Sequence, residues 1–246
     1  MVCDSFKNKV VVVTGAANGI GAAICHRFAR EGARIGLLDM DAKGVQAASD
    51  KLRASGVDAV GIRCDVVNED ECTSALKEII GLYGGVDILV NNAGITQRSA
   101  FIDTQTSVYR RVMDVNFFGS LHCTKAAMAS LIERKGIIIV IESLAGIAPL
   151  LGRTGYCASK HALHGFFTSL RSELRATGTH IMLVCPGFVE TSLQSRALGG
   201  DGRVTTHPQS MVGKPVSAES VAGQIYKGAV KRKHLLVLTP VGKLTY

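Results

Sequence analysis

The feature that most constrains the fold is a strict alternation of short apolar runs with longer amphipathic segments. The runs are rich in Val, Ile and Leu with little polar alternation, as in strands buried on both faces of a sheet. They lie at 10–13, 34–38, 59–63, 86–90, 136–141, 180–184 and 235–238. Helical periodicity marks 19–31, 42–54, 68–83, 104–132, 155–177 and 217–230. Seven strands alternating with six helices predict an α/β fold with a doubly wound, parallel sheet flanked by helices.

The chain length predicts one domain over 1–246, because 246 residues suit a single large α/β unit and no internal boundary, repeat or low-complexity tract appears. One stretch, 188–215, breaks the rhythm and carries four glycines. It is longer than an ordinary connection, so we expect a lid or substrate loop there. A plain flexible excursion is the alternative.

Charge and cysteine content narrow the class of protein. The net charge is +8, but the basic residues are scattered and no nucleic-acid motif accompanies them, so we expect no nucleic-acid partner. Seven cysteines, an odd number without metal-ligand spacing, indicate free thiols, no metal site and a cytoplasmic, reducing location. No signal core and no apolar run near 18 residues appear, so no membrane span is expected.

A glycine-rich turn follows the first predicted strand and opens the first helix. It reads Thr14-Gly15-Ala16-Ala17-Asn18-Gly19-Ile20-Gly21. Gly15 permits the sharp turn, Gly19 lets the backbone approach a phosphate, and Gly21 lets the helix pack on the sheet. A strand, a glycine turn and a helix N-terminus together form a site for a pyrophosphate. The sequence therefore predicts a Rossmann-type dinucleotide-binding domain.

The spacing of this turn, Thr-Gly-x-x-x-Gly-Ile-Gly, resembles that of the short-chain dehydrogenase/reductase (SDR) family. Further motifs of that family follow in order over residues 10–238. They are Asp65-Val66, Asn92-Ala93-Gly94, Asn116, Ser143, Tyr156-x-x-x-Lys160 and Pro186-Gly187 with Val189 and Thr191. The resemblance implies an oxidoreductase that acts on CH–OH groups with a nicotinamide cofactor.

The acidic residue Asp39 ends the second predicted strand and bears on which dinucleotide binds. Its carboxylate can accept hydrogen bonds from the adenosine ribose hydroxyls and would repel a 2′-phosphate. NAD is therefore expected rather than NADP. The alternative role for Asp39 is a helix cap, although Asp41 directly precedes the helical pattern and can supply it.

Two motifs take their roles from the resemblance. Asp65-Val66 would hold the adenine ring, although Asp65 could equally cap the helix that begins near Asn68. The motif Asn92-Ala93-Gly94 would leave room for the cofactor beside the fourth strand.

The reaction is assigned to Tyr156 and Lys160. Residues four apart share one face of a helix, and an ammonium close to a phenol is expected to lower the pKa of the phenol. Tyr156 then becomes a proton acceptor from an alcohol or a donor to a carbonyl. Ser143 follows the fifth strand, at the edge where ligands bind, and its hydroxyl can hydrogen-bond the substrate oxygen.

Three further assignments surround this group. Asn116 falls inside a long predicted helix; the resemblance implies a water-holding role in a proton relay, and a structural amide bonded to backbone is the alternative. By the resemblance, Pro186, Gly187, Val189 and Thr191 contact the nicotinamide carboxamide. Glu142 departs from the small polar residue usual beside Ser143, and if buried it needs a partner.

Apolar residues near the reacting group suggest an apolar alcohol or ketone substrate, such as a steroid, a lipid or an acyl compound. They are residues 147–151, Phe188, Val189, Leu193 and Leu198. Arg153 is the candidate for a substrate carboxylate. A 3-oxoacyl-thioester reductase is the alternative activity, disfavoured by Asp39, and a non-catalytic dinucleotide sensor is a further alternative. The resemblance also implies a homodimer or homotetramer paired through helices 104–132 and 155–177.

Overall fold

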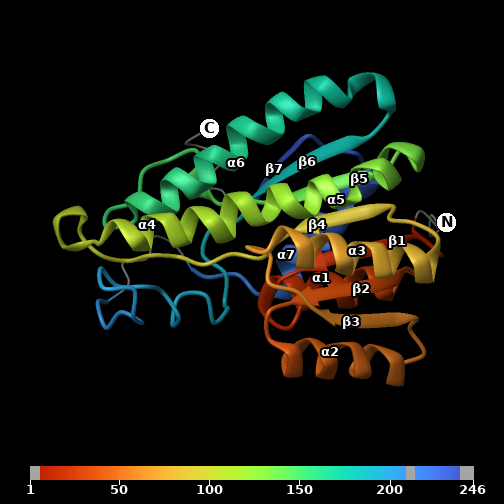
Figure 1. The fold of residues 1–246 in the computed structure, drawn as a ribbon, viewed down its shortest axis with the longest axis horizontal. Helices are drawn as coiled ribbons and strands as arrows, with labels where there is room; N and C mark the ends of the chain where they lie inside the picture. Colours follow the sequence, from red (N-terminus) through yellow and green to blue (C-terminus); the bar gives the residue numbers. More distant parts are fainter. Residues whose placement is uncertain (1–5, 209–213, 239–246) are drawn as a thin grey trace.

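The computed structural model describes residues 6–208 and 214–238. Seven strands form one sheet in the order β3-β2-β1-β4-β5-β6-β7, and every pairing is parallel (Figure 1). The strands are β1 (Val10–Thr14), β2 (Arg34–Asp39), β3 (Ala59–Arg63), β4 (Ile88–Asn91), β5 (Ile137–Ile141), β6 (His180–Cys185) and β7 (Leu235–Val237). The predicted fold class is confirmed. The strand order reverses between β1 and β4, which opens a crevice at the carboxyl edge.

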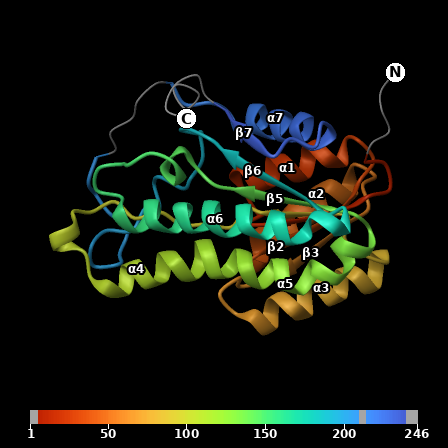
Figure 2. The ribbon, with the colours of Figure 1, turned by 90° about the horizontal axis from the view of Figure 1, so that it is seen from above.

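Helices cover both faces of the sheet (Figure 2). On one face lie α1 (Gly19–Ala29), α2 (Ala42–Ala54) and α7 (Ala218–Val230); on the other lie α3 (Glu69–Tyr83), α4 (Thr106–Met113), α5 (Gly119–Glu133) and α6 (Thr154–Glu173). Along β1, Val11 and Val13 face the first layer whereas Val10 and Val12 face the second. Both faces of the strand are therefore apolar, which explains its unbroken valine run.

The long helix predicted at 104–132 is continuous in direction but not in hydrogen bonding. A π-helical segment, Asp114–Phe118, separates α4 from α5. A π-helical turn holds one more residue than an α-helical turn, and such turns are frequent at functional sites. The helix predicted at 155–177 starts one residue earlier and ends in a 3₁₀ turn, Leu174–Thr177, before Gly178.

The segment that breaks the sequence rhythm extends over the carboxyl edge of the sheet. Its residues 188–208 have no helix and no named strand, and Leu198 forms isolated bridges to Gln97 and Val204. Residues 209–213 of the predicted lid lie outside the described part of the chain. Among the helices the structure describes, none has the length and apolarity needed to span a bilayer.

Candidate active site

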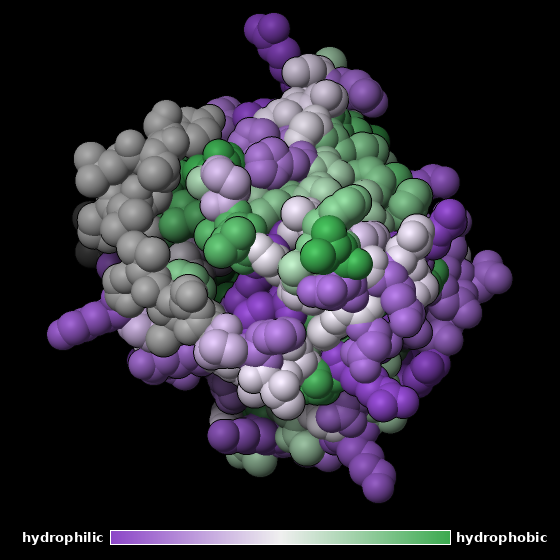
Figure 3. Space-filling model, turned by 90° about the vertical axis from the view of Figure 1, so that its left-hand side faces the viewer, coloured by the Kyte–Doolittle hydropathy of each residue, from purple (hydrophilic) through white to green (hydrophobic). Residues whose placement is uncertain are grey.

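A cleft of about 1440 Å³ opens at the carboxyl edge of the sheet. In the space-filling view of this edge, apolar surface borders a recess with hydrophilic walls (Figure 3). The predicted residues that line the cleft are Gly15, Asn18, Gly19, Ile20, Asp39, Asp65, Val66, Asn92, Ala93, Gly94, Ser143, Tyr156, Lys160, Pro186, Gly187, Val189 and Thr191. Gly21 and Asn116 lie behind its wall. The structure thus brings together residues that span nearly the whole sequence.

The glycine turn is built so tightly that side chains are excluded from it. Gly15 has φ of +64°, and a Cβ on Gly21 would lie 2.1 Å from the carbonyl oxygen of Gly15. The amide of Asn92 donates hydrogen bonds to the carbonyl oxygens of Thr14 (2.8 Å) and Gly15 (3.1 Å). The Thr14 hydroxyl accepts from the backbone N–H of Ala93 at 3.0 Å. The ends of β1 and β4 are therefore fastened together beneath the turn.

Asn18 connects this turn to the segment after β6. Its Oδ1 accepts hydrogen bonds from the Ser192 hydroxyl (3.3 Å) and from Nη2 of Arg196 (3.1 Å). Thr191 packs beside Gly19, where a Cβ would meet its methyl group at 3.2 Å. Sequence analysis missed Ser192 and Arg196, because nothing in their spacing indicates a contact with the first helix.

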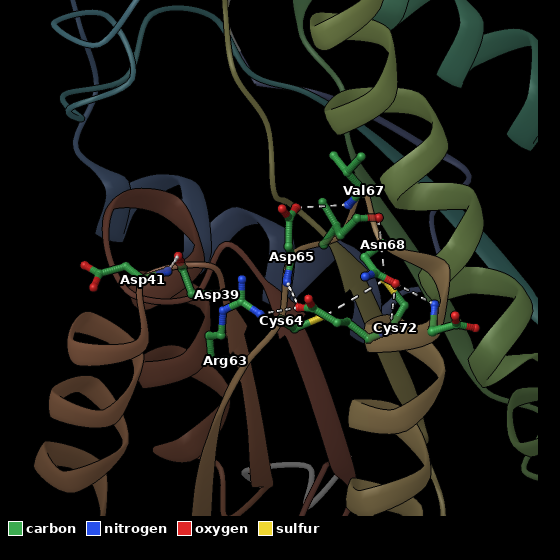
Figure 4. A network of polar contacts seen from close by, with 11 residues as sticks. Asp39, Asp41, Arg63, Cys64, Asp65, Val67, Asn68 and Cys72 are labelled. Carbon is green, nitrogen blue, oxygen red and sulfur yellow. Dashed lines mark hydrogen bonds and ion pairs between the residues drawn. The ribbon is translucent and has the colours of Figure 1, made fainter.

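Asp39 and Asp41, at the end of β2, have distinct local roles (Figure 4). Asp39 accepts hydrogen bonds from the backbone N–H groups of Ala17 (2.9 Å) and Asp41 (3.0 Å). Asp41 caps α2 by accepting from the N–H of Gly44 at 3.0 Å. The cap alternative for Asp39 is therefore wrong, since Asp41 holds that position.

Asp65 is likewise not the cap of the helix that follows it. Asn68 caps α3 by accepting from two backbone N–H groups, whereas Asp65 accepts from the N–H of Val67 at 3.1 Å. Oε2 of Glu71 accepts from Arg63 (2.7 Å) and from the N–H of Asp65 (2.9 Å), which holds this loop in place (Figure 4). The Asp65 side chain stays at the wall of the cleft.

Ser143, Tyr156 and Lys160 converge between β5 and the start of α6. Tyr156 and Lys160 are 8% and 5% exposed. Nζ of Lys160 donates to the carbonyl oxygen of Ile141 at 2.8 Å and lies 5.7 Å from the centre of the Tyr156 ring. Ser143 accepts from the N–H of Ala145 at 3.1 Å. An acid–base phenol, a hydroxyl and an ammonium are thus gathered in one place.

The electrostatics of this group differ from the sequence-based expectation. Burial raises the pKa of Tyr156, and a hydrogen bond with Ser143 and the charge of Arg153 oppose that rise. Burial also lowers the pKa of Lys160 to about 8, against the opposing charge of Glu142. The expected lowering of the Tyr156 pKa by Lys160 is wrong for the protein alone, because burial disfavours both charged forms.

Asn116 is fully buried in the π-helical segment, and its side-chain amide is committed to protein partners. Oδ1 accepts from the N–H of Ile95 at 2.8 Å, and Nδ2 donates to the carbonyl oxygen of Ile95 (3.0 Å) and to the Ser159 hydroxyl (2.8 Å). These bonds match the structural alternative considered for this residue. They fix the loop after β4 against α6, and the water-relay role stays a prediction.

Glu142, the departure from the family pattern, has a partner. It is 2% exposed, and its Oε2 accepts from Nδ1 of His164 (3.2 Å) and from the Cys185 thiol (3.3 Å). Its Oε1 has no hydrogen-bond partner among the described residues. Burial raises the pKa of this carboxyl, and His164 is the main opposing influence. The partner of Glu142 that the sequence left undecided is therefore the imidazole of His164, on α6 two turns after Tyr156.

A doubly wound sheet with this glycine turn and this Ser–Tyr–Lys group defines an oxidoreductase of the dinucleotide-binding class. Residues 9–199 match the family described as short chain dehydrogenase, and the chain belongs to that family.

Curated proteins similar to this chain carry the name of the same family. The chain is 33% identical to the zebrafish (Danio rerio) dehydrogenase/reductase SDR family member 7B over 98% of its length and 80% of the relative. It is 31% identical to a Drosophila melanogaster dehydrogenase/reductase SDR family protein 7-like, over 99% of its own length and 76% of that relative. A Burkholderia phymatum SDR solved in complex with NAD shares the fold, with a TM-score of 0.87, 24% identity and coverage of 98% of this chain and 92% of that one.

Proposed function

We propose that this enzyme transfers a hydride between NAD(H) and an apolar alcohol/ketone pair, with Tyr156 as the acid–base group. The observation that carries the proposal is the convergence of Ser143, Tyr156 and Lys160 in the same cleft as the glycine turn. A phenol that can exchange a proton is what an alcohol/carbonyl reaction requires beside the hydride site.

The shape of the turn fits a pyrophosphate. The turn packs so closely that no side chain fits at Gly21, and α1 begins within it at Gly19, so backbone N–H groups and the helix dipole face an anion there. Asp39 lies at the end of β2 on the cleft wall, which favours a free ribose over a phosphorylated one. The NAD in the Burkholderia phymatum relative supports the same choice.

When bound, the nicotinamide supplies or accepts the hydride. In the reductive direction the Tyr156 hydroxyl donates its proton to the carbonyl oxygen as negative charge develops there. Ser143 hydrogen-bonds the same oxygen, and Lys160 stands behind the phenol with its Nζ held by Ile141. Leu150, Leu193 and Leu198 line the cleft on the substrate side and favour an apolar body.

The assignment of Tyr156 is tested by Tyr156→Phe, which removes only the exchangeable proton. We expect NADH binding to persist and kcat to fall by at least about a hundredfold, the scale of a general acid–base group. NADH fluorescence titration and an alcohol and ketone panel measure the two quantities. Full turnover in the variant would reject Tyr156 as the acid–base group, and tight NADH binding without turnover in the wild type would favour the dinucleotide-sensor alternative.

The cofactor preference is tested by Asp39→Ala. Removing the carboxylate eliminates both its ribose hydrogen bonds and its repulsion of a 2′-phosphate, so the ratio of kcat/KM with NAD to kcat/KM with NADP should fall by at least about tenfold. Asp50→Ala, on the exposed side of α2, is the matched control. An unchanged ratio in Asp39→Ala would contradict the ribose assignment.

The oligomer and the location stay predictions. α5 and α6 cover the same face of the sheet (Figures 1 and 2), and we propose that two copies pair through them. The six described cysteines are free thiols, and this supports a reducing, cytoplasmic location; Cys3 lies outside the described residues.

A further inference from the structure

Two arginines line the substrate side of the cleft close to the reacting phenol. Arg153 directly precedes α6, three residues before Tyr156, and is only 6% exposed. Arg98 follows β4, and its backbone N–H donates to the carbonyl oxygen of Leu198 at 2.7 Å. Burial and the repulsion of Arg98 lower the pKa of the Arg153 guanidinium, so the two positive charges act on each other. This corner of the cleft therefore carries a concentrated positive potential.

No carboxylate of the described residues compensates this charge. Arg153 donates to two neutral oxygens, Oγ1 of Thr96 and Oε1 of Gln194, each at 2.8 Å. Nε and Nη1 of Arg98 are buried and have no hydrogen-bond partner within the described residues. Neither guanidinium forms an ion pair with a carboxylate in that part of the chain. Buried guanidinium nitrogens without an acceptor are costly, which calls for a partner.

The remainder of the chain offers little that could fill this role. Residues 209–213 and 239–246 contain no Asp or Glu, and Asp4 is the single acidic side chain of residues 1–5. The segment after β6 instead reinforces the arrangement, since Gln194 holds Arg153 and Leu198 holds the backbone of Arg98. With Asp4 as the single acidic side chain in these segments, we expect the anionic partner to come from a bound ligand.

We propose that Arg98 and Arg153 form a carboxylate subsite, so that the substrate is an apolar oxo or hydroxy acid rather than a neutral ketone or alcohol. The proposal rests on the proposed function, because the acid group is placed relative to the reacting carbon at Tyr156. Arg98 and Arg153 both line the cleft without a carboxylate partner among the described residues, and charge-assisted hydrogen bonds from a guanidinium to a substrate carboxylate are short and strong. Leu150 and Leu198 line the same cleft and would contact the apolar body.

The first test compares an acid with its neutral ester. Turnover of 5-oxodecanoate and of its methyl ester is measured with NADH in the wild type, Arg98→Met and Arg110→Met. Arg110 is an exposed arginine on α4 that does not line the cleft, so its variant controls for the loss of one positive charge. We expect the wild type and Arg110→Met to favour the acid in kcat/KM by about tenfold to a hundredfold, and Arg98→Met to lose that preference.

The second test needs no catalysis. Calorimetric binding of dodecanoate and of dodecanamide to the NAD-saturated protein is compared in the same three proteins. We expect dodecanoate to bind at least about tenfold more tightly than the amide in the wild type and Arg110→Met, and equally in Arg98→Met. Selective dodecanoate binding without turnover would support the subsite and reject the proposed function. Turnover with equal kcat/KM for acid and ester, or equal affinities in the wild type, would overturn the subsite.

Discussion

Replacement of Lys160 by methionine should stabilise the cofactor-free protein at neutral pH, although it removes a group from the active site. The folded protein lowers the pKa of this ammonium from 10.5 to about 8, because burial disfavours the charge. A difference of this size corresponds to roughly 3 kcal/mol of stability lost at pH 7. Methionine fills a similar volume without charge and loses only the bond to Ile141, which contributes about 1 kcal/mol. The expected net gain is about 2 kcal/mol.

The pH dependence gives the sign of the effect. The folded-state pKa lies below the unfolded one, so the cost of Lys160 is complete below about pH 8 and disappears as the pH rises towards 10.5. Lys160→Met should therefore lose its advantage near pH 10, where the remaining cost of the ammonium, about 1 kcal/mol, is offset by the missing hydrogen bond.

Urea unfolding of the cofactor-free protein at pH 7 and pH 10 measures both values. Lys43→Met, at an exposed position on α2, is the control and should change stability by less than about 0.5 kcal/mol at either pH. A Lys160→Met variant that is less stable than the wild type at pH 7, or whose advantage is the same at both pH values, would refute the burial argument.

Two further variants address the charge beside the site and the turn under the cofactor. Glu142→Gln should raise the melting temperature at pH 7. Burial raises the folded-state pKa of this carboxyl, so its ionisation costs stability at pH values above its ordinary pKa of 4.5. The gain in melting temperature should shrink as the pH falls towards 4.5, and a gain independent of pH would contradict this reasoning. Gly21→Ala should weaken NADH binding by at least about tenfold and lower stability by about 1–3 kcal/mol, because the added Cβ meets the carbonyl of Gly15 at 2.1 Å. Gly223→Ala, on α7 with open space around it, should instead be neutral or stabilising by up to about 1 kcal/mol, and equal NADH affinity in the two glycine variants would refute the steric argument.

Most of the sheet and its helices could be predicted because apolar periodicity reports burial directly. The valine run of β1 faces apolar layers on both sides, so its lack of polar alternation was enough to predict a strand buried on both faces. The π-helical segment Asp114–Phe118 was not predicted, since one extra residue in a turn alters hydrogen bonding without altering composition. The strand expected at 86–90 is Ile88–Asn91 instead: the N–H of Val86 bonds to the Ser130 hydroxyl, whereas the backbone of Asp87 already bonds to Val10 and Ile137 at the edge of the pairing.

The site residues that belong to a motif within one helix, or that directly follow a strand, could be predicted. Tyr156 and Lys160 come from one helix, and Ser143 follows the strand beside it. His164 and Arg98 were missed for a different reason: their importance depends on contacts between elements far apart in the sequence. His164 matters through Glu142 on another element, and Arg98 matters because two of its guanidinium nitrogens have no hydrogen-bond partner among the described residues.

The extra residue in the turn around Asn116 marks a place where this helix can change length without losing its register. One residue more or fewer within an ordinary α-helix turns everything beyond it by about 100°. A π-helical turn absorbs its additional residue, so Cys123, Ala127 and Leu131 of α5 keep facing the core that they fill. Deleting one residue from Asp114–Phe118 would restore an unbroken α-helix and leave α5 in phase, and the loss would fall on the bonds of Asn116 to Ile95 and Ser159.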